Sequence, residues 1–95
     1  MQHQQSPRFV VAGEIDMATA AHLRRRLEEH VAASHGEIVV DCEGLTFIDS
    51  SGIKVLLDVA AFASTQGRRF VATNVHPHCR RTFQVAGIEG FLGIN

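Results

Sequence analysis

The sequence predicts a single small α/β domain in which helices flank a mixed, mainly parallel β-sheet. Short apolar runs of strand length alternate with longer segments of helical periodicity. No linker, repeat or low-complexity segment divides the 95 residues. This alternation indicates βαβ units with right-handed crossovers, so most of the strands are expected to run parallel.

The first strand and helix follow from local patterns. Phe9 to Ala12 is a short apolar run that stops at Gly13, as a buried strand does. From Ala20 to Val31, apolar residues recur at helical spacing and form one apolar face. Asp16 lies where a carboxylate can cap this helix, and Gly36 lies beyond its end.

The rest of the chain repeats the alternation. A second apolar run is followed by a short polar segment and a further apolar stretch, and a helical pattern then ends at Gln66 and Gly67. A third strand precedes a helix that begins at Pro77, a residue favoured in the first helical turn. The expected elements are strands at Ile38–Cys42 and Leu45–Ile48, a helix from Asp49 to Ser64, a strand at Phe70–Thr73, a helix from Pro77 to Ala86 and a last strand within Ile88–Ile94.

Composition excludes several classes of function. Nine Lys and Arg against ten Asp and Glu give a net charge of -1, and Trp and Tyr are absent, so a basic, stacking nucleic-acid surface is not expected. The longest apolar run, Ile53 to Ala63, is interrupted by charges and too short to span a bilayer. Cys42 and Cys79 are too few for a disulfide scaffold. We therefore expect a soluble, cytoplasmic domain, with residues 1–6 flexible and without a signal segment.

The start of the second helix carries the feature of most chemical interest. Asp49 or Ser50 can cap the free amides there, and Gly52 permits close packing. Capping needs one such side chain, which leaves the hydroxyl of Ser51 unexplained. A phosphate on Ser51 would add roughly -1.5 to -2 charges beside the positive end of the helix dipole, where the fold tolerates them. The same charge would act against any partner docked there, so we predict a phosphorylation switch.

Two segments resemble the STAS domain family and, within it, the bacterial anti-sigma factor antagonists. They are Gly13–Asp16, which enters an Ala- and Leu-rich helix, and Leu45–Ile53, which contains Asp-Ser-Ser-Gly. A weaker stretch from Asn74 to Ile88 is similar to the family's third helix region, and the resemblance covers Phe9 to Leu92. It implies a STAS-like fold spanning residues 1–95 as one domain.

The resemblance also implies a regulatory cycle. Ser51 matches the serine that an anti-sigma factor serine kinase phosphorylates. The unphosphorylated protein binds the anti-sigma factor and releases sigma factor, phosphorylation abolishes binding, and a phosphatase restores it. ATP and the catalytic groups belong to the kinase, so we expect no enzyme activity, cofactor or metal in this chain. The partner-binding residues expected from the motif and its neighbourhood are Asp16, Thr19, Asp49, Ser50, Gly52, Ile53 and Lys54.

Two further features bear on the prediction, the side chain of Lys54 and the two ends of the sequence. Lys54 follows Gly52 in the first turn and is interpreted as a solvated lysine, with pairing to the phosphate as the alternative. The family has an additional strand before the one at Phe9 and a helix after the strand near Phe91, and this sequence offers little for either. Sheet edge or apolar surface exposed there would favour a homodimer.

Three alternative functions compete with this one. A hydrolase would need a nucleophile with a base and an oxyanion site, and no G-x-S-x-G motif is present. A zinc site could use His76, His78 and Cys79 with Cys42, but a closed site needs four matched ligands, and the histidines are better interpreted as polar residues at a helix start. Within the STAS family, the chain could instead be an accessory subunit of a lipid-transport ATPase complex or of a larger signalling assembly. The intact Asp-Ser-Ser-Gly segment favours the phosphorylation switch.

Overall fold

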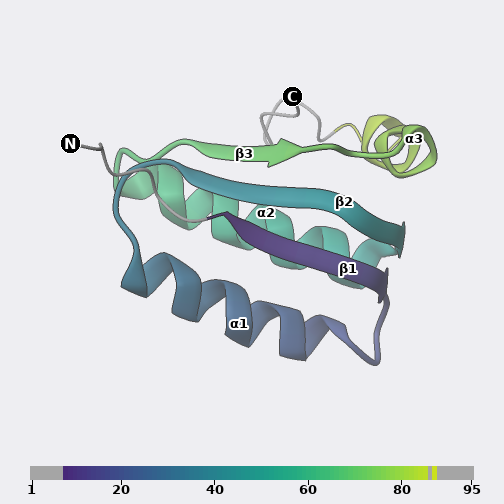
Figure 1. The fold of residues 1–95 in the computed structure, drawn as a ribbon, viewed down its shortest axis with the longest axis horizontal. Coiled ribbons are helices and arrows are strands. Elements are labelled where there is room, and N and C mark those ends of the chain that lie inside the picture. Colours follow the sequence, from purple (N-terminus) through teal and green to yellow (C-terminus); the bar gives the residue numbers. More distant parts are fainter. Residues whose placement is uncertain (1–7, 86, 88–95) are drawn as a thin grey trace.

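Strands and helices alternate along the chain as the sequence predicts (Figure 1). The computed structural model describes residues 8–85 and residue 87. Its elements are β1 (Phe9–Ile15), α1 (Ala20–Ala33), β2 (Ile38–Ile48), α2 (Ser50–Thr65), β3 (Phe70–Thr73) and α3 (Pro77–Val85). The predicted last strand within Ile88–Ile94 and the segment 1–6 lie outside the described residues.

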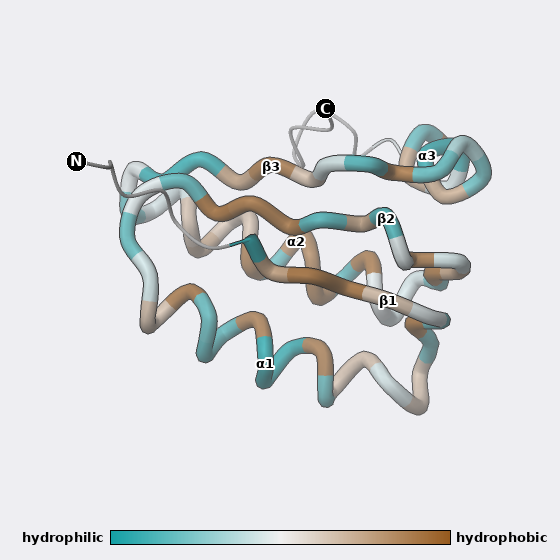
Figure 2. The backbone as a smooth tube through the Cα atoms, in the orientation of Figure 1, coloured by the Kyte–Doolittle hydropathy of each residue, from teal (hydrophilic) through white to brown (hydrophobic). Residues whose placement is uncertain are grey.

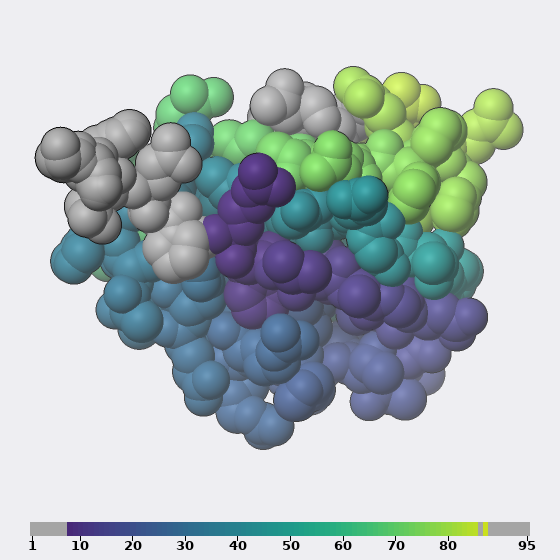
Figure 3. All heavy atoms as spheres, in the orientation of Figure 1, coloured from purple at the N-terminus to yellow at the C-terminus, as the bar shows by residue number. Residues whose placement is uncertain are grey.

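The described sheet has three strands in the order β1-β2-β3, and both neighbouring pairs are parallel. Helices α1 and α2 lie along the same face of this sheet, and α3 lies beyond the end of β3 (Figure 1). In the space-filling view, side chains of β1 reach the surface between those of α1 and β2 (Figure 3). None of the described helices has the length and apolarity to cross a membrane.

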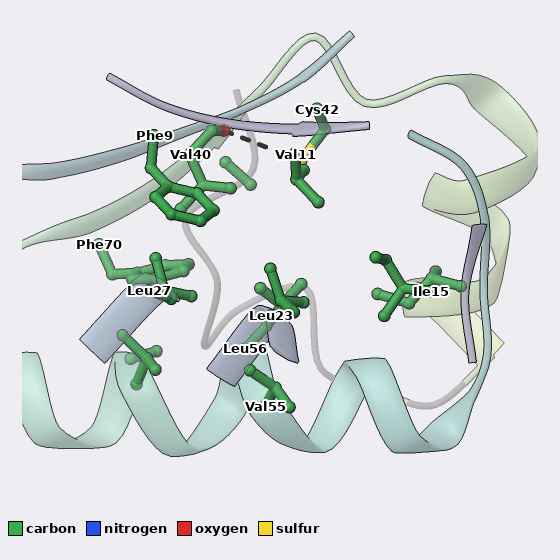
Figure 4. Packing of buried hydrophobic residues seen from close by; sticks show 14 of the residues in the cluster. Phe9, Val11, Ile15, Leu23, Leu27, Val40, Cys42, Val55, Leu56 and Phe70 are labelled. Carbon is green, nitrogen blue, oxygen red and sulfur yellow. Dashed lines mark hydrogen bonds between the residues drawn. The ribbon is translucent and has the colours of Figure 1, made fainter. Parts of the chain in front are cut away.

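The hydrophobic core fills the space between the sheet and the two long helices. The strands β1 and β2 are strongly hydrophobic over part of their length, and α1 shows apolar residues at intervals (Figure 2). Side chains from the strands, such as Val11 and Val40, point toward Leu23 and Leu56 of the helices (Figure 4). Leu27, at the centre of the predicted apolar face of α1, is fully buried. Burial of about 25 cal/mol per Å² of apolar surface is the main stabilisation of such a core.

Strand β2 is longer than predicted, because the polar residues Glu43 and Gly44 do not interrupt it. They lie at the first of two irregularities in the pairing of β1 with β2. Opposite the stretch from Val10 to Ala12 of β1, β2 contains one extra residue, and it contains another opposite Gly13 and Glu14. Gly44 is required by a close approach, since a Cβ there would lie 2.9 Å from the Cβ of Ala12. The glycine therefore lets β2 bulge and continue rather than end.

Two histidines at the start of α3 form hydrogen bonds with backbone carbonyl oxygens in the irregular part of β2. The Nε2 of His76 donates to the carbonyl oxygen of Glu43 at 2.6 Å, and the Nε2 of His78 donates to that of Thr46 at 2.5 Å. The two rings are stacked, with centroids 6.5 Å apart. Their interpretation as polar residues at a helix start is thus incomplete, because both satisfy backbone carbonyls of β2.

Candidate functional site

The candidate site lies where the parallel strands β1 and β2 end side by side. The backbone N–H of Asp49 donates to the carbonyl oxygen of Ile15 at 3.1 Å, so the loop after β1 and the start of α2 are adjacent. A shallow depression between them is lined by Asp16, Met17, Ala18 and Asp49. The topology therefore gathers two segments, separated in sequence, into one surface.

Asp49 is the residue that caps α2. Its Oδ1 accepts the backbone N–H of Ser51 at 2.8 Å and that of Gly52 at 3.3 Å, and its carbonyl oxygen accepts the N–H of Ile53 at 3.0 Å. Of the two caps that the sequence allows, the structure selects Asp49 over Ser50. The carboxylate also places a negative charge at the positive end of the helix dipole, which is favourable.

The two serine hydroxyls that follow the cap are left without a structural task. Ser50 is exposed and Ser51 is half-buried. Among residues 8–85, neither hydroxyl makes a hydrogen bond, and the carboxylate of Asp49 accepts the amides of Ser51 and Gly52 instead. Ser51 is thus a hydroxyl in the first turn of α2 whose chemistry is free for another purpose.

Gly52 sets how closely α2 approaches the strands. A Cβ on Gly52 would lie 2.6 Å from the Cγ2 of Ile15 and 2.7 Å from the Cγ1 of Ile48, distances that real Cβ atoms do not tolerate. Gly52 is therefore buried, and the next side chain, Ile53, is only 9% exposed and belongs to the core. The sequence predicts both as partner-binding residues, and in the structure both are buried at the start of α2.

The loop after β1 is held by its own polar side chains. The Oδ1 of Asp16 accepts the N–H groups of Ala18 at 2.9 Å and Thr19 at 3.2 Å. The hydroxyl of Thr19 donates to the carbonyl oxygen of Glu14 at 3.2 Å and accepts the N–H of Asp16 at 3.0 Å. Helix α1 begins only at Ala20, after an N-cap residue Thr19 that makes no side-chain cap. Asp16 therefore stabilises the turn before the helix rather than capping the helix itself.

Met17, which the sequence interpretation missed, is a large apolar side chain exposed on this surface. Its exposed fraction is 82%, on a loop whose backbone is fixed on either side by Asp16 and Thr19. Methionine is unbranched and polarizable, and it is often used at binding surfaces that adapt to their partners. The available signal was a methionine in the short segment between the predicted first strand and the first helix.

Lys54 takes part in an ion-pair network that joins α2 to α1. Its Nζ lies 3.3 Å from the Oδ2 of Asp58, and the Nη2 of Arg24 lies 2.8 Å from the same oxygen. Hydrogen bonding to Arg24, followed by the weaker contacts of Lys54, holds the pKa of the Asp58 carboxyl below its usual value. Lys54 remains 72% exposed, so it is solvated as predicted but also paired along its own helix.

The two cysteines that the sequence offers as metal ligands are buried thiols. Burial, with the charge of Asp41 and the neighbouring Cys79 adding to it, raises the pKa of the Cys42 thiol to about 12. Burial also raises the pKa of Cys79. In the part of the chain that the structure describes, no three His, Cys, Asp or Glu residues are grouped to hold a metal ion.

Comparisons with known proteins bear on the family and the fold of the chain. A family model described as Mlab, STAS domain, matches residues 1–93. An anti-sigma F factor antagonist of Paenibacillus polymyxa is 28% identical over 96 residues, which span 99% of this chain and 82% of that protein. The putative anti-sigma factor antagonist BtrV of Bordetella bronchiseptica is 32% identical over 82 residues, 86% of this chain and 68% of that protein.

The fold is similar to that of a solved protein of the same description. The structure of the anti-sigma factor antagonist SpoIIAA in its unphosphorylated form superposes with a TM-score of 0.74 at 22% identity, covering 99% of this chain and 86% of that chain. At this level of identity the likeness concerns the fold, with its parallel strands and flanking helices.

Proposed function

The chain belongs to the STAS domain family, together with the anti-sigma factor antagonists that it resembles, and from that premise we propose that it is a phosphorylation-controlled antagonist of an anti-sigma factor. Its unphosphorylated form binds an anti-sigma factor that is also a serine kinase, and sigma factor is released. Phosphorylation of Ser51 by that kinase ends the binding, and a phosphatase renews it. The protein acts in the cytoplasm as a binding module rather than an enzyme.

One observation carries the proposal. The hydroxyl of Ser51 is in the first turn of α2, and the cap at that position is already supplied by the carboxylate of Asp49 at 2.8 Å from the N–H of Ser51. A serine needed for capping would lose its acceptor role on modification, whereas Ser51 accepts a phosphate without disturbing these hydrogen bonds. The helix dipole favours the added charge by about 0.3 to 1 kcal/mol.

The electrostatics of the surface explain how a phosphate would end binding. Asp16 and Asp49 already place two carboxylates around the depression beside the serine. A phosphoserine adds roughly -1.5 to -2 charges to this acidic surface. Burying this charge in an interface next to two carboxylates, and away from water, costs several kcal/mol, and each ~1.4 kcal/mol changes affinity tenfold. The modified surface therefore rejects a partner that the unmodified surface accepts, while the fold persists.

The proposal is tested by mapping the modification. The protein is incubated with the anti-sigma factor kinases of its source organism and ATP, and the phosphorylated residue is identified by mass spectrometry. We expect a single phosphate on Ser51, lost in Ser51→Ala and kept in Ser50→Ala, which changes the adjacent exposed hydroxyl. Phosphate on Ser50, or no modification by any of these kinases, would contradict the proposal.

A second candidate function is that of an accessory subunit of a lipid-transport ATPase complex, or a component of a larger signalling assembly. The observation that favours it is the description of the matching family model as an Mlab STAS domain. Such a subunit would co-purify with an ATPase and membrane components and would keep its partner in Ser51→Asp.

The homodimer expected from the sequence stays a prediction, for which sedimentation of the purified chain is the test.

A further inference from the structure

Lys54 stands one turn along α2 from Ser51. Residues three apart on a helix are neighbours on its surface, with Cβ atoms about 5–6 Å apart. The Lys54 side chain is 72% exposed, and its Nζ lies 3.3 Å from one carboxylate oxygen of Asp58 and 3.5 Å from the other. A flexible, solvated ammonium group with long contacts to its present partner is free to swing toward the start of the helix.

Asp58 does not depend on Lys54 for charge compensation. The Nη2 of Arg24 lies 2.8 Å from the Oδ2 of Asp58, a shorter contact than that of Lys54. The Arg24 side chain is 34% exposed, about half the exposure of Lys54, so solvent screens its pairing less. Departure of Lys54 therefore leaves Asp58 paired with Arg24, and the link between α1 and α2 is kept.

The start of α2 has an acidic side chain in its cap and another in the neighbouring loop. Asp49 is half-buried beneath the first turn, and Asp16 faces the same depression from the loop after β1. A phosphate introduced beside them meets the helix dipole as a favourable partner but two carboxylates as unfavourable ones. Lys54 is the nearest basic side chain in sequence that can offset them.

We propose that Lys54 is the counter-ion of a phosphate on Ser51, leaving Asp58 to Arg24 when Ser51 is modified. The inference rests on the proposed function and deepens it. In the unmodified protein Lys54 is held along the helix by Asp58, away from the serine. In the modified protein it turns to the phosphate and stabilises its dianionic form.

The experiment places phosphoserine at residue 51 by genetic-code expansion, so that no kinase is required. The second pKa of the phosphate is measured by ³¹P NMR titration in the parent, in Lys54→Gln and in Arg69→Gln. Arg69 is the matched control, because it is 80% exposed and paired with Glu37 at 3.5 Å. Lys54 is also exposed, so its replacement leaves the core untouched.

We expect the phosphate pKa in Lys54→Gln to be higher than in the parent by about half a pH unit, since loss of one nearby cation disfavours the dianion. Arg69→Gln should match the parent. Equal phosphate pKa values in the parent and Lys54→Gln would overturn the assignment, as would an equal change in both variants. Because phosphoserine is incorporated during translation, this result is independent of whether a kinase recognises Ser51, which the mass-spectrometric mapping decides separately.

Discussion

The backbone N–H of Asp49 donates to the carbonyl oxygen of Ile15 at 3.1 Å, which joins the residue before α2 to the end of β1. The bond brings two segments that are distant in sequence into one rigid corner. On one side Asp49 caps α2 below Ser51, and on the other Asp16 orders the loop that presents Met17. A surface of this kind needs only backbone geometry and a few side chains, which a chain of 95 residues can supply.

The first prediction concerns the packing of this corner. Gly52→Ala should lower the free energy of unfolding by about 1–3 kcal/mol, because the new Cβ would lie 2.6 Å from Ile15 and force α2 away from the strands. Ser64→Ala, at an exposed position on the same helix, is the control and should stay within about 0.5 kcal/mol of the parent. Denaturant unfolding measures both. A Gly52→Ala protein as stable as the control would refute the close-packing role.

A second prediction concerns the exposed methionine. If Met17 is buried by the partner, Met17→Ala should weaken binding to the anti-sigma factor by about tenfold or more, as for an apolar anchor in an interface. Phe62→Ala is the matched control, because Phe62 is 51% exposed but lies three turns along α2 from Ser51. Titration calorimetry compares the two. Equal affinities for Met17→Ala and the parent would remove the loop from the interface.

The alternation of strands and helices was predictable because hydrophobic periodicity is a local property. The face of α1 that contains Leu23 and Leu27 is buried as its spacing predicts. The continuity of β2 was not predictable in the same way. Glu43 and Gly44 resemble a turn locally. Only the neighbouring strand shows that the chain bulges instead, because a Cβ on Gly44 would lie 2.9 Å from the Cβ of Ala12.

The candidate site was predictable in part. Residue type and position limit the helix cap to Asp49 or Ser50, and the structure selects Asp49. Exposure of Met17 depends on how the loop is oriented against the strands, which is a tertiary property. The pairing of Lys54 with Asp58 follows helical spacing, but Arg24, which competes for the same carboxylate, comes from another helix.

A third prediction addresses the attachment of α3. His78→Ala removes the donor to the carbonyl oxygen of Thr46 and should destabilise α3 by about 0.5–1.5 kcal/mol, seen as amide hydrogen exchange up to about tenfold faster in α3. His22→Ala serves as the control, since His22 is exposed on α1 and its Nδ1 hydrogen-bonds to Arg25 at 3.4 Å, away from α3. Unchanged exchange in α3 would show that this hydrogen bond does not hold the helix.

A fourth prediction follows from the Cys42 thiol. Its pKa is raised by burial from 9.0 to about 12, so the unfolded chain loses this proton at lower pH than the folded chain. The stabilisation is fully present below pH 9 and is lost as pH rises toward 12, at about 1.4 kcal/mol per pH unit between these values. Cys42→Ala should show a shallower alkaline decline in unfolding free energy. The same decline in both proteins would contradict the account.

The most direct test of the central claim is the affinity of the anti-sigma factor kinase for two forms of this protein, unmodified and phosphorylated on Ser51, measured by titration calorimetry under identical conditions. We predict that the phosphate weakens binding by more than about 100-fold, since burying its charge in the interface beside Asp16 and Asp49 costs several kcal/mol. The thermal unfolding of the two forms should remain similar, because the helix dipole accommodates the charge. Equal affinities for the two forms would contradict the claim that Ser51 is the switch.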